Sequence, residues 1–210
     1  MLLVARTLPV MEARPHASRL PAARRREQLL EVALEVFGEL GFHPASMNDV
    51  AEAAGVTKPV LYQHFRSKRE LYKQVLTDVG DHLLDAITKA TAAARSPHEQ
   101  VELGFIAYFR FVEANEAAFR VLFGGGTRRD EEFAAQVAIV EGAIAEAIAA
   151  LIDVEELTAE QRRQLAHGLV GLAEGSSRLW MDGGAEEPAE EVARLMANLA
   201  WRGLRGIRDS

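Results

Sequence analysis

The sequence predicts an all-α protein of nine to ten helices. Three observations lead to this fold class. Apolar residues recur at spacings of three and four through almost the whole chain, which is the period of an amphipathic helix. No stretch shows the sustained apolar–polar alternation, bounded by turn residues, that is typical of a strand. Capping residues and glycines divide the chain into segments of helix length.

The first two helices have clear local boundaries. The apolar face of residues 24–40 stops at Gly41, a residue type that commonly follows a helix. Ser46 precedes the second helix, and the motif SMND is a capping box that satisfies free backbone N–H groups. This second helix covers MNDVAEAA and ends at Gly55.

A third short helix follows a tight turn. Thr57 is its predicted cap, and Pro59 suits its first turn, because a residue there has no intrahelical N–H bond to lose. The helix ends near Phe65. Two short helices joined by a tight turn with glycine, after one longer helix, form a helix-turn-helix.

The rest of the chain predicts six more helices, at about residues 68–94, 96–115, 116–123, 127–151, 158–182 and 187–207. We expect the glycines at 124–126 to end one of these helices, and Thr127 with Asp130 to cap the next. Gly80 lies inside the longest early helix, where it is either a point of bending or a site of close packing.

Composition and the N-terminal segment indicate a cytoplasmic protein. The chain has no cysteine, which excludes disulfides and fits a reducing compartment. The start MLLVARTLPV has only a short apolar run before Arg6, too short for the core of a signal peptide. No stretch approaches the roughly 20 apolar residues of a membrane span. Residues 1–20 are expected to form a flexible arm, with Met11 as an alternative start.

The charge distribution separates the N-terminal third from the rest. The net charge of −7 argues at first against a nucleic-acid partner. Residues 14–73, however, hold ten Lys and Arg against seven Asp and Glu, whereas residues 74–210 hold thirteen against twenty-three. A basic N-terminal segment on an otherwise acidic protein favours binding of a polyanion, such as a nucleic acid, by that segment. On charge alone, a chance distribution remains an equal alternative.

The third helix has the pattern of a recognition helix, the one that enters the DNA major groove. Leu61 and Phe65 are four residues apart and face the core. The outward-facing side chains are Lys58, Tyr62, Gln63 and His64. Lysine can bind guanine or phosphate, and glutamine can bond an adenine edge at two points. The alternative is an ordinary amphipathic helix with a solvated polar face.

Residues 24–65 and the segment after them closely resemble the N-terminal domain of TetR-family transcriptional regulators: they read RRREQLLEVALEVFGELGFHPASMNDVAEAAGVTKPVLYQHF, followed by SKRELY. The resemblance implies phosphate contacts by Ser46, Thr57, Tyr62, His64 and Lys68, and base contacts by Lys58, Pro59 and Gln63. Pro59 departs from the small residue that is common at its position. The family also implies a homodimer on a palindromic double-stranded DNA operator.

Four further stretches, KPVLYQHF, FRFVEANEAAFRVLF, EFAAQV and GLVGLAEGSSRLW, are similar to actinobacterial TetR-type regulators of fatty-acid synthesis, some of which bind long-chain acyl-CoA. This similarity implies control of lipid genes through an apolar, acyl-linked effector. The alternative within the family is a repressor of efflux or catabolic genes that senses another hydrophobic molecule. We therefore expect a DNA-binding domain over 21–67 and a ligand-binding and dimerisation domain over 68–210.

Aromatic residues gather in the middle of the second domain. A helix that is apolar on every side, as residues 101–112 are, is expected to be buried. The predicted lining of a lipid-sized pocket is Phe105, Tyr108, Phe109, Val112, Phe119, Phe123, Phe133, Val137, Leu172 and Ser176. A solid aromatic core without a cavity is an equal alternative, because a sequence does not show a void.

A stripe of small residues marks the predicted dimer interface. The residues assigned to it are Gly168, Gly171, Gly175, Leu195 and Leu199. Glycines allow two helices to approach closely, and a two-fold axis would build a four-helix seam from two copies. The alternative is that these glycines pack inside one chain.

Other classes of protein fit the sequence less well. FGGGTRR lacks the Lys-Ser/Thr of a phosphate-binding loop, and no HExxH motif is present, so we expect neither an enzyme nor a cofactor. Asp78, His82 and Asp85 share a helix face, but a solvated polar face explains them better than a metal site. A helical enzyme and a ligand-free architectural DNA-binding protein remain as rival classes.

Overall fold

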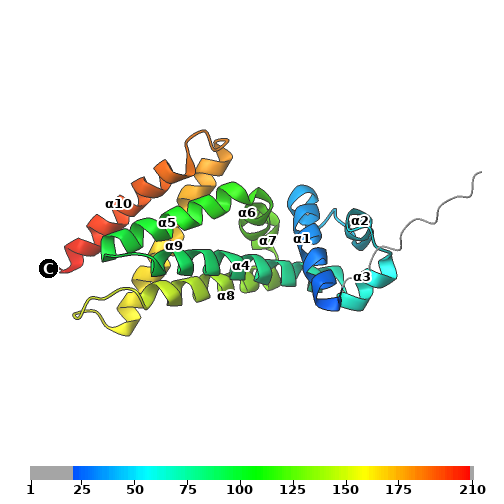
Figure 1. Cartoon of the computed structure of the whole chain (residues 1–210), viewed down its shortest axis with the longest axis horizontal. Coiled ribbons are helices and arrows are strands. Elements are labelled where there is room, and N and C mark those ends of the chain that lie inside the picture. Colours follow the sequence, from blue (N-terminus) through cyan, green and yellow to red (C-terminus); the bar gives the residue numbers. More distant parts are fainter. Residues whose placement is uncertain (1–20, 209–210) are drawn as a thin grey trace, which may run out of the picture.

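The computed structural model describes residues 21–208, and within that range it contains ten α-helices and no strand. The molecule is elongated, with α1, α2 and α3 at one end and the end of α10 at the other (Figure 1). The all-α prediction and the predicted order of domains are confirmed. The predicted arm at 1–20 and the alternative start at Met11 lie outside the described residues.

The N-terminal domain consists of α1 (Ala22–Leu40), α2 (Met47–Ala53) and α3 (Lys58–His64). The core side chains that are at most 2% exposed include Leu29, Ala33, Phe37, Val50, Leu61 and Phe65. The capping box at α2 forms as predicted: the Ser46 hydroxyl accepts from the backbone N–H groups of Asn48 and Asp49, and Asp49 Oδ2 accepts from the Ser46 backbone N–H at 2.8 Å.

The long helix α4 (Lys68–Ala92) runs from the N-terminal domain into the body. It packs against α5 (Pro97–Ala114) and α8 (Glu131–Ala149). Two further long helices, α9 (Ala159–Asp182) and α10 (Ala189–Arg208), complete the body. α9 packs against α8 and α10 packs along α5 (Figure 1).

The segment after α6 (Glu116–Phe123) differs from the prediction. The glycines at 124–126 follow the end of α6 as predicted, but Gly125–Arg129 forms the short helix α7, which the sequence did not indicate. Thr127 is not a cap, since its side chain is buried and its hydroxyl donates to the carbonyl oxygen of Val121 at 2.8 Å. Asp130 alone caps α8 by accepting from the backbone N–H groups of Glu132 and Phe133. Thr127 thereby joins α7 to the end of α6.

Gly80 was predicted to be either a point of bending or a site of close packing, and in the structure it is a site of close packing. A Cβ atom at this position would lie 2.5 Å from Cγ2 of Val140 on α8. Two helices that approach this closely leave no room for a larger side chain. Gly80 therefore brings α4 and α8 together.

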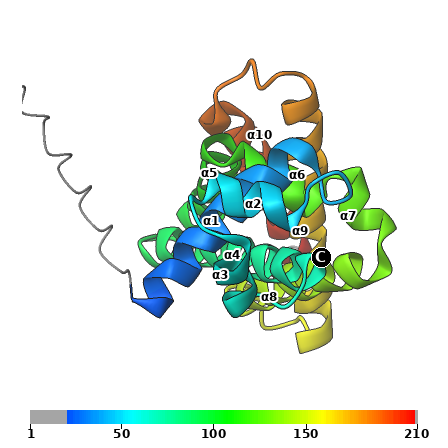
Figure 2. The same cartoon turned by 90° about the vertical axis from the view of Figure 1, so that its right-hand side faces the viewer.

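The two domains share a continuous aromatic contact. The ring of Phe133, at the start of α8, lies 4.6 Å from the rings of both Phe42 and Tyr72, measured between centroids. α1 also packs against α6, where a Cβ at Gly38 would lie 2.7 Å from Cβ of Ala117. Figure 2, viewed along the long axis, shows α1, α2 and α3 in front of the body helices. The body therefore supports the N-terminal domain through α4, α6 and α8.

Candidate DNA interface and ligand cavity

The recognition helix α3 presents its polar side to solvent. Leu61 and Phe65 are 0% exposed and anchor the helix to the domain core. The four side chains Lys58, Pro59, Tyr62 and Gln63 are exposed, and His64 is half-buried. The two buried anchors fix the rotation of α3, and that rotation decides which residues can reach a base edge.

The two predicted N-cap residues differ in how their hydroxyl groups are used. The hydroxyl of Ser46 is occupied by the capping box of α2. Thr57 lies at the N-cap of α3, but its side chain makes no capping hydrogen bond and is exposed. Thr57 is therefore the one of the two whose hydroxyl is not engaged in a cap.

Lys68 has different partners from those predicted. Its ammonium donates to the backbone carbonyl oxygens of Phe42 at 2.7 Å, Ala45 at 2.8 Å and His43 at 3.2 Å. The nitrogen also lies 4.4 Å from the centroid of the Phe42 ring. An ammonium has three N–H donors, and three carbonyl groups accept them here. The geometry ties Lys68 to the loop between α1 and α2, and the phosphate contact of this residue stays a prediction.

Further basic side chains lie beside α3. Arg26 stacks over Phe65, with its guanidinium carbon 5.4 Å from the ring centroid, and donates to the Gln74 side chain. Arg66, directly after α3, is exposed. Arg66 was not among the predicted DNA contacts, although a basic residue immediately after a recognition helix is a usable signal for phosphate contact.

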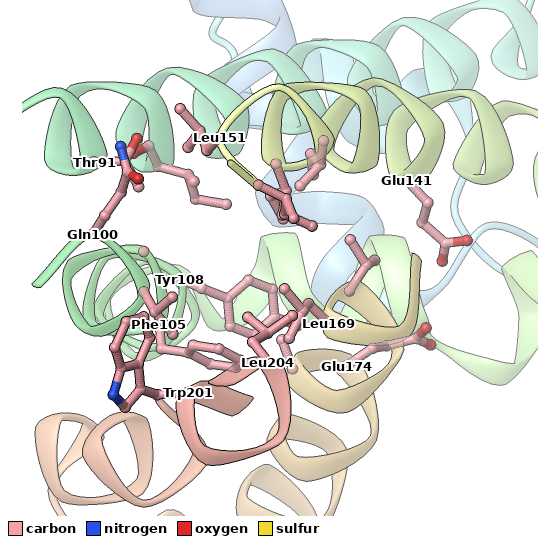
Figure 3. Close-up of a pocket in the computed structure, with 18 of the residues that line it drawn as sticks. Thr91, Gln100, Phe105, Tyr108, Glu141, Leu151, Leu169, Glu174, Trp201 and Leu204 are labelled. Carbon is pink, nitrogen blue, oxygen red and sulfur yellow. The ribbon is translucent and has the colours of Figure 1, made fainter. Parts of the chain in front are cut away.

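The body contains a cavity of about 750 Å³. Residues from α4, α5, α8, α9 and α10 line it (Figure 3). Four predicted pocket residues are among them: Phe105, Tyr108, Phe123 and Val137. A volume of this size is typical of sites for small molecules, which span about 300–1,000 Å³.

Six predicted pocket residues do not line the cavity: Phe109, Val112, Phe119, Phe133, Leu172 and Ser176. Phe109 faces away from it and lies 5.7 Å from Trp180 between ring centroids. Phe133 belongs to the contact between the domains, and the Ser176 hydroxyl donates to the Leu172 carbonyl within α9. These errors have one cause: an apolar side chain is equally suited to a solid core and to a cavity wall.

Several lining residues were not predicted: Leu83, Ile87, Thr91, Gln100, Gly104, Val140, Glu141, Ile144, Glu174 and Trp201. Of these residues, Glu174 could have been identified from the sequence. It lies four residues after Val170 and three before Ser177, so it shares their helix face, although it carries a charge.

Polar groups lie at both ends of the cavity, and its lining also includes Asp153, Glu155, Glu156 and Arg205. Figure 3 shows Thr91 and Gln100 at one end, with Glu141 and Glu174 at the other. Between them, the Tyr108 hydroxyl lies 2.9 Å from the Ser177 hydroxyl. Burial raises the pKa of Tyr108 to about 12, so this phenol stays neutral at physiological pH.

The predicted dimer residues form an exposed face on α9 and α10. Gly168, Gly171 and Gly175 are exposed, and a Cβ added at each would meet no atom within 4 Å. Leucines are also exposed here: Leu179 at 78%, Leu195 at 63% and Leu199 at 58%. The glycines therefore do not pack within the single chain, which was the alternative considered for them.

Across residues 21–208 there is no group of three or more His, Cys, Asp or Glu side chains placed to hold a metal ion. In the same part of the chain, no helix combines the length and apolar character needed to cross a membrane.

Two family models match the chain. Residues 29–75 match the model described as bacterial regulatory proteins, tetR family. Residues 97–203 match the model described as a tetracyclin repressor-like C-terminal domain. The first match includes the recognition helix, and the second includes most residues of the cavity.

Individual relatives agree with these matches. The HTH-type transcriptional activator FasR of Mycolicibacterium smegmatis is 35% identical over 191 residues, which cover 90% of this chain and 87% of FasR. The HTH-type transcriptional repressor KstR2 of the same species is 34% identical over 45% of this chain and 46% of its own length.

Solved structures match the whole fold. A TetR-like transcriptional regulator from Rhodococcus sp. RHA1 has a TM-score of 0.72 and 32% identity, covering 90% of this chain and 100% of that one. The regulator FadR from Bacillus subtilis in complex with stearoyl-CoA has a TM-score of 0.71, covering 83% of this chain and 96% of that one. At 15% identity, this second likeness shows only that the fold is shared.

Proposed function

This chain belongs to the TetR family of bacterial transcriptional regulators, and we propose that it binds a palindromic operator as a homodimer and changes its DNA affinity when an apolar, acyl-linked molecule occupies the cavity. The observation that carries the proposal is the cavity of about 750 Å³ in the same chain as an exposed recognition helix. Family membership places the protein among transcription regulators and not among enzymes.

The DNA-binding part of the proposal rests on α3. Lys58 and Gln63 read bases, while Thr57, Tyr62 and His64 contact phosphates. Their exposure and the two buried anchors Leu61 and Phe65 support this division. One helix of seven residues is too short to specify a site alone, so two copies are needed. In the dimer, the two recognition helices enter successive major grooves about 34–36 Å apart. An operator partner implies a cytoplasmic site of action.

The dimer part rests on the exposed face of α9 and α10. Three leucines that are 58–78% exposed are costly to leave in water, since burial of each leucine side chain contributes roughly 1.5–3 kcal/mol. The open space above Gly168, Gly171 and Gly175 allows a second copy of the helix pair to approach closely. These features support a four-helix seam.

The effector part rests on the cavity wall. Between its polar ends the lining is aliphatic and aromatic, with side chains such as Ile87, Phe105, Val140 and Ile144. Such a wall suits an extended hydrocarbon chain and does not satisfy the hydroxyl groups of a sugar. The stearoyl-CoA complex of FadR makes acyl compounds the first candidates to test. Lipid and fatty-acid genes are then the proposed targets.

The test uses full-length protein freed of lipid and a DNA operator obtained by selection from random sequence. Stearoyl-CoA and stearate are titrated while operator affinity is measured. We expect a change of about 5–150-fold, the usual range for allosteric coupling. If both compounds neither bind nor change the operator affinity, the acyl effector is wrong.

A cavity-filling variant supplies the matched control. Gly104 lines the cavity, whereas Gly142 on α8 does not, and a Cβ at Gly142 would meet no atom within 4 Å. Gly104→Leu should weaken stearoyl-CoA binding or reproduce its effect on operator affinity. Gly142→Leu should do neither. Equal behaviour of the two variants would place the effector outside this cavity.

A further inference from the structure

A cluster of four charged residues closes one end of the cavity. Glu141 and Glu174 both line the cavity and lie together at the end opposite Thr91 and Gln100 (Figure 3). The carboxylate of Glu174 accepts from both Arg128 and Arg178. Arg128 Nη2 also lies 3.6 Å from Glu141 Oε1. Arg128 is therefore shared between the two carboxylates of the cavity wall.

The two carboxylates of this cluster are more buried than the two arginines beside them. Glu174 is 8% exposed, so its carboxylate has little access to water. Glu141 Oε1 is buried and has no hydrogen-bond donor among the described residues. A buried carboxylate is costly unless a cation stays close to it. Any molecule that enters this end of the cavity therefore changes the electrostatic attraction between Arg128 and the two carboxylates.

The residue before Arg128 faces the opposite way and contacts helices that lead to the DNA-binding domain. The Thr127 hydroxyl is 2.6 Å from the Tyr72 hydroxyl on α4 and donates to the Val121 carbonyl on α6. The Tyr72 ring lies 5.0 Å from the rings of both Phe37 and Phe42, between centroids. Helix α7 thus carries two consecutive side chains, one tied to the cavity and one tied to the core of the DNA-binding domain.

We propose that the ion pair between Arg128 and Glu174 is the contact through which cavity occupancy changes DNA affinity. This inference rests on the proposed function and names the regulation of the same cavity. In the arrangement described, Glu174 holds Arg128 and α7 keeps Thr127 against Tyr72. An occupant that reaches the Glu141–Glu174 end displaces Arg128. Helix α7 then shifts, and the contact between Thr127 and Tyr72 loosens. The occupant acts because it favours one position of α7 over the other.

The first test needs no ligand. Operator affinity is measured for lipid-free protein carrying Glu174→Gln, Arg128→Gln or both substitutions. Each single variant should shift operator affinity at least fivefold in the same direction. The double variant should shift it no further, because both substitutions remove one contact. Glu190→Gln is the matched control, since Glu190 forms an exposed interhelical ion pair with Arg110 away from the cavity. If the cavity variants stay within twofold of Glu190→Gln, the proposal is overturned.

A second variant separates this role from general support of the fold. Thr127→Val breaks the contact with Tyr72 and leaves the ion pair intact. It should reproduce the shift in operator affinity, and Glu174→Gln should add nothing to it. Additive effects of Thr127→Val and Glu174→Gln would show two independent contributions and contradict the proposal. Because Arg128 is only partly buried, Arg128→Gln serves as the readout if Glu174→Gln does not fold.

Titration with stearoyl-CoA then tests the role of the ion pair separately from the identity of the effector. If it changes operator affinity in the wild type and in Glu174→Gln equally, the ion pair is not the contact, although the proposed function holds. If it changes the wild type only, the inference is supported. If it has no effect on the wild type while the ligand-free variants shift, the ion pair is the contact and the acyl effector is wrong.

Discussion

The ammonium nitrogen of Lys68 lies 2.7 Å from the carbonyl oxygen of Phe42, so the first residue of α4 is bonded to the loop that follows α1. Two more carbonyl groups of the same loop, those of His43 and Ala45, accept from this nitrogen. The loop leads directly into α2, so any movement of the start of α4 is transmitted to the helix-turn-helix. Lys68 is thus a positioning residue within the domain.

Lys68→Met should destabilise the DNA-binding domain. A hydrogen bond to a charged group contributes about 1.5–3 kcal/mol, and several are lost together. Thermal unfolding measures the loss. The slope of log operator affinity against log salt concentration should not change. Replacement of a residue that contacts phosphate would instead reduce the size of this slope by about 0.9. Arg66→Met, at the exposed basic residue directly after α3, is the control that should lower the slope. A lower slope for Lys68→Met at unchanged stability would show that Lys68 contacts phosphate.

Gln63→Ala should relax base preference at one position of each half-site. The glutamine amide can bond an adenine edge at two points, and the loss of such a contact costs roughly 1–3 kcal/mol. Selection of operators from a random pool, done in parallel for variant and wild type, measures the change. Gln136→Ala on α8 is the control, because Gln136 bonds to Thr77, away from α3. An unchanged preference at every position would remove Gln63 from the set of base-reading residues.

Leu195→Glu combined with Leu199→Glu should give a monomer. Both leucines are more than half exposed in the single chain, and charges placed there would repel their counterparts across a two-fold axis. Sedimentation measures the mass, and operator affinity should fall with the loss of the second recognition helix. Ile139→Glu is the matched control, since Ile139 on α8 is 64% exposed but lies outside the proposed interface. A stable dimer of the double variant would place the interface elsewhere.

Gly80→Ala and Gly142→Ala should change stability in opposite directions. Alanine is favoured over glycine inside a helix by about 1 kcal/mol. At Gly80 the added methyl group meets Val140 at 2.5 Å, and overpacking of this kind costs roughly 1–3 kcal/mol, so the packing term should outweigh the helix term. At Gly142 the methyl group meets no atom within 4 Å, and only the helix term remains. Urea unfolding of both variants checks the signs. Stabilisation by Gly80→Ala would show that α4 and α8 can move apart at little cost.

Local signals were sufficient for the helices and for the recognition surface. The capping box at Ser46 and the spacing of Leu61 and Phe65 act within a few residues, so their consequences can be derived from the chain itself. The exposed side of α3 follows from the buried one, because a helix has only one face toward the core. The glycines at 124–126 follow the end of a helix as predicted, because α6 stops at Phe123. The prediction failed for Thr127, whose hydroxyl bonds to Val121 and Tyr72 instead of capping α8.

The ligand cavity was decided by the tertiary structure. Residues 101–112 are apolar nearly all round, and the sequence predicts their burial without distinguishing a cavity wall from a solid core. Phe105 and Phe109 differ only in the direction they face once α4, α8, α9 and α10 have packed around α5. The same holds for Lys68, whose partners lie 23–26 residues away along the chain, and for the contact of Glu174 with Arg128, which lies 46 residues away. A charge on a helix can be predicted to need a partner, but only the packing of helices determines which group lies within hydrogen-bonding distance.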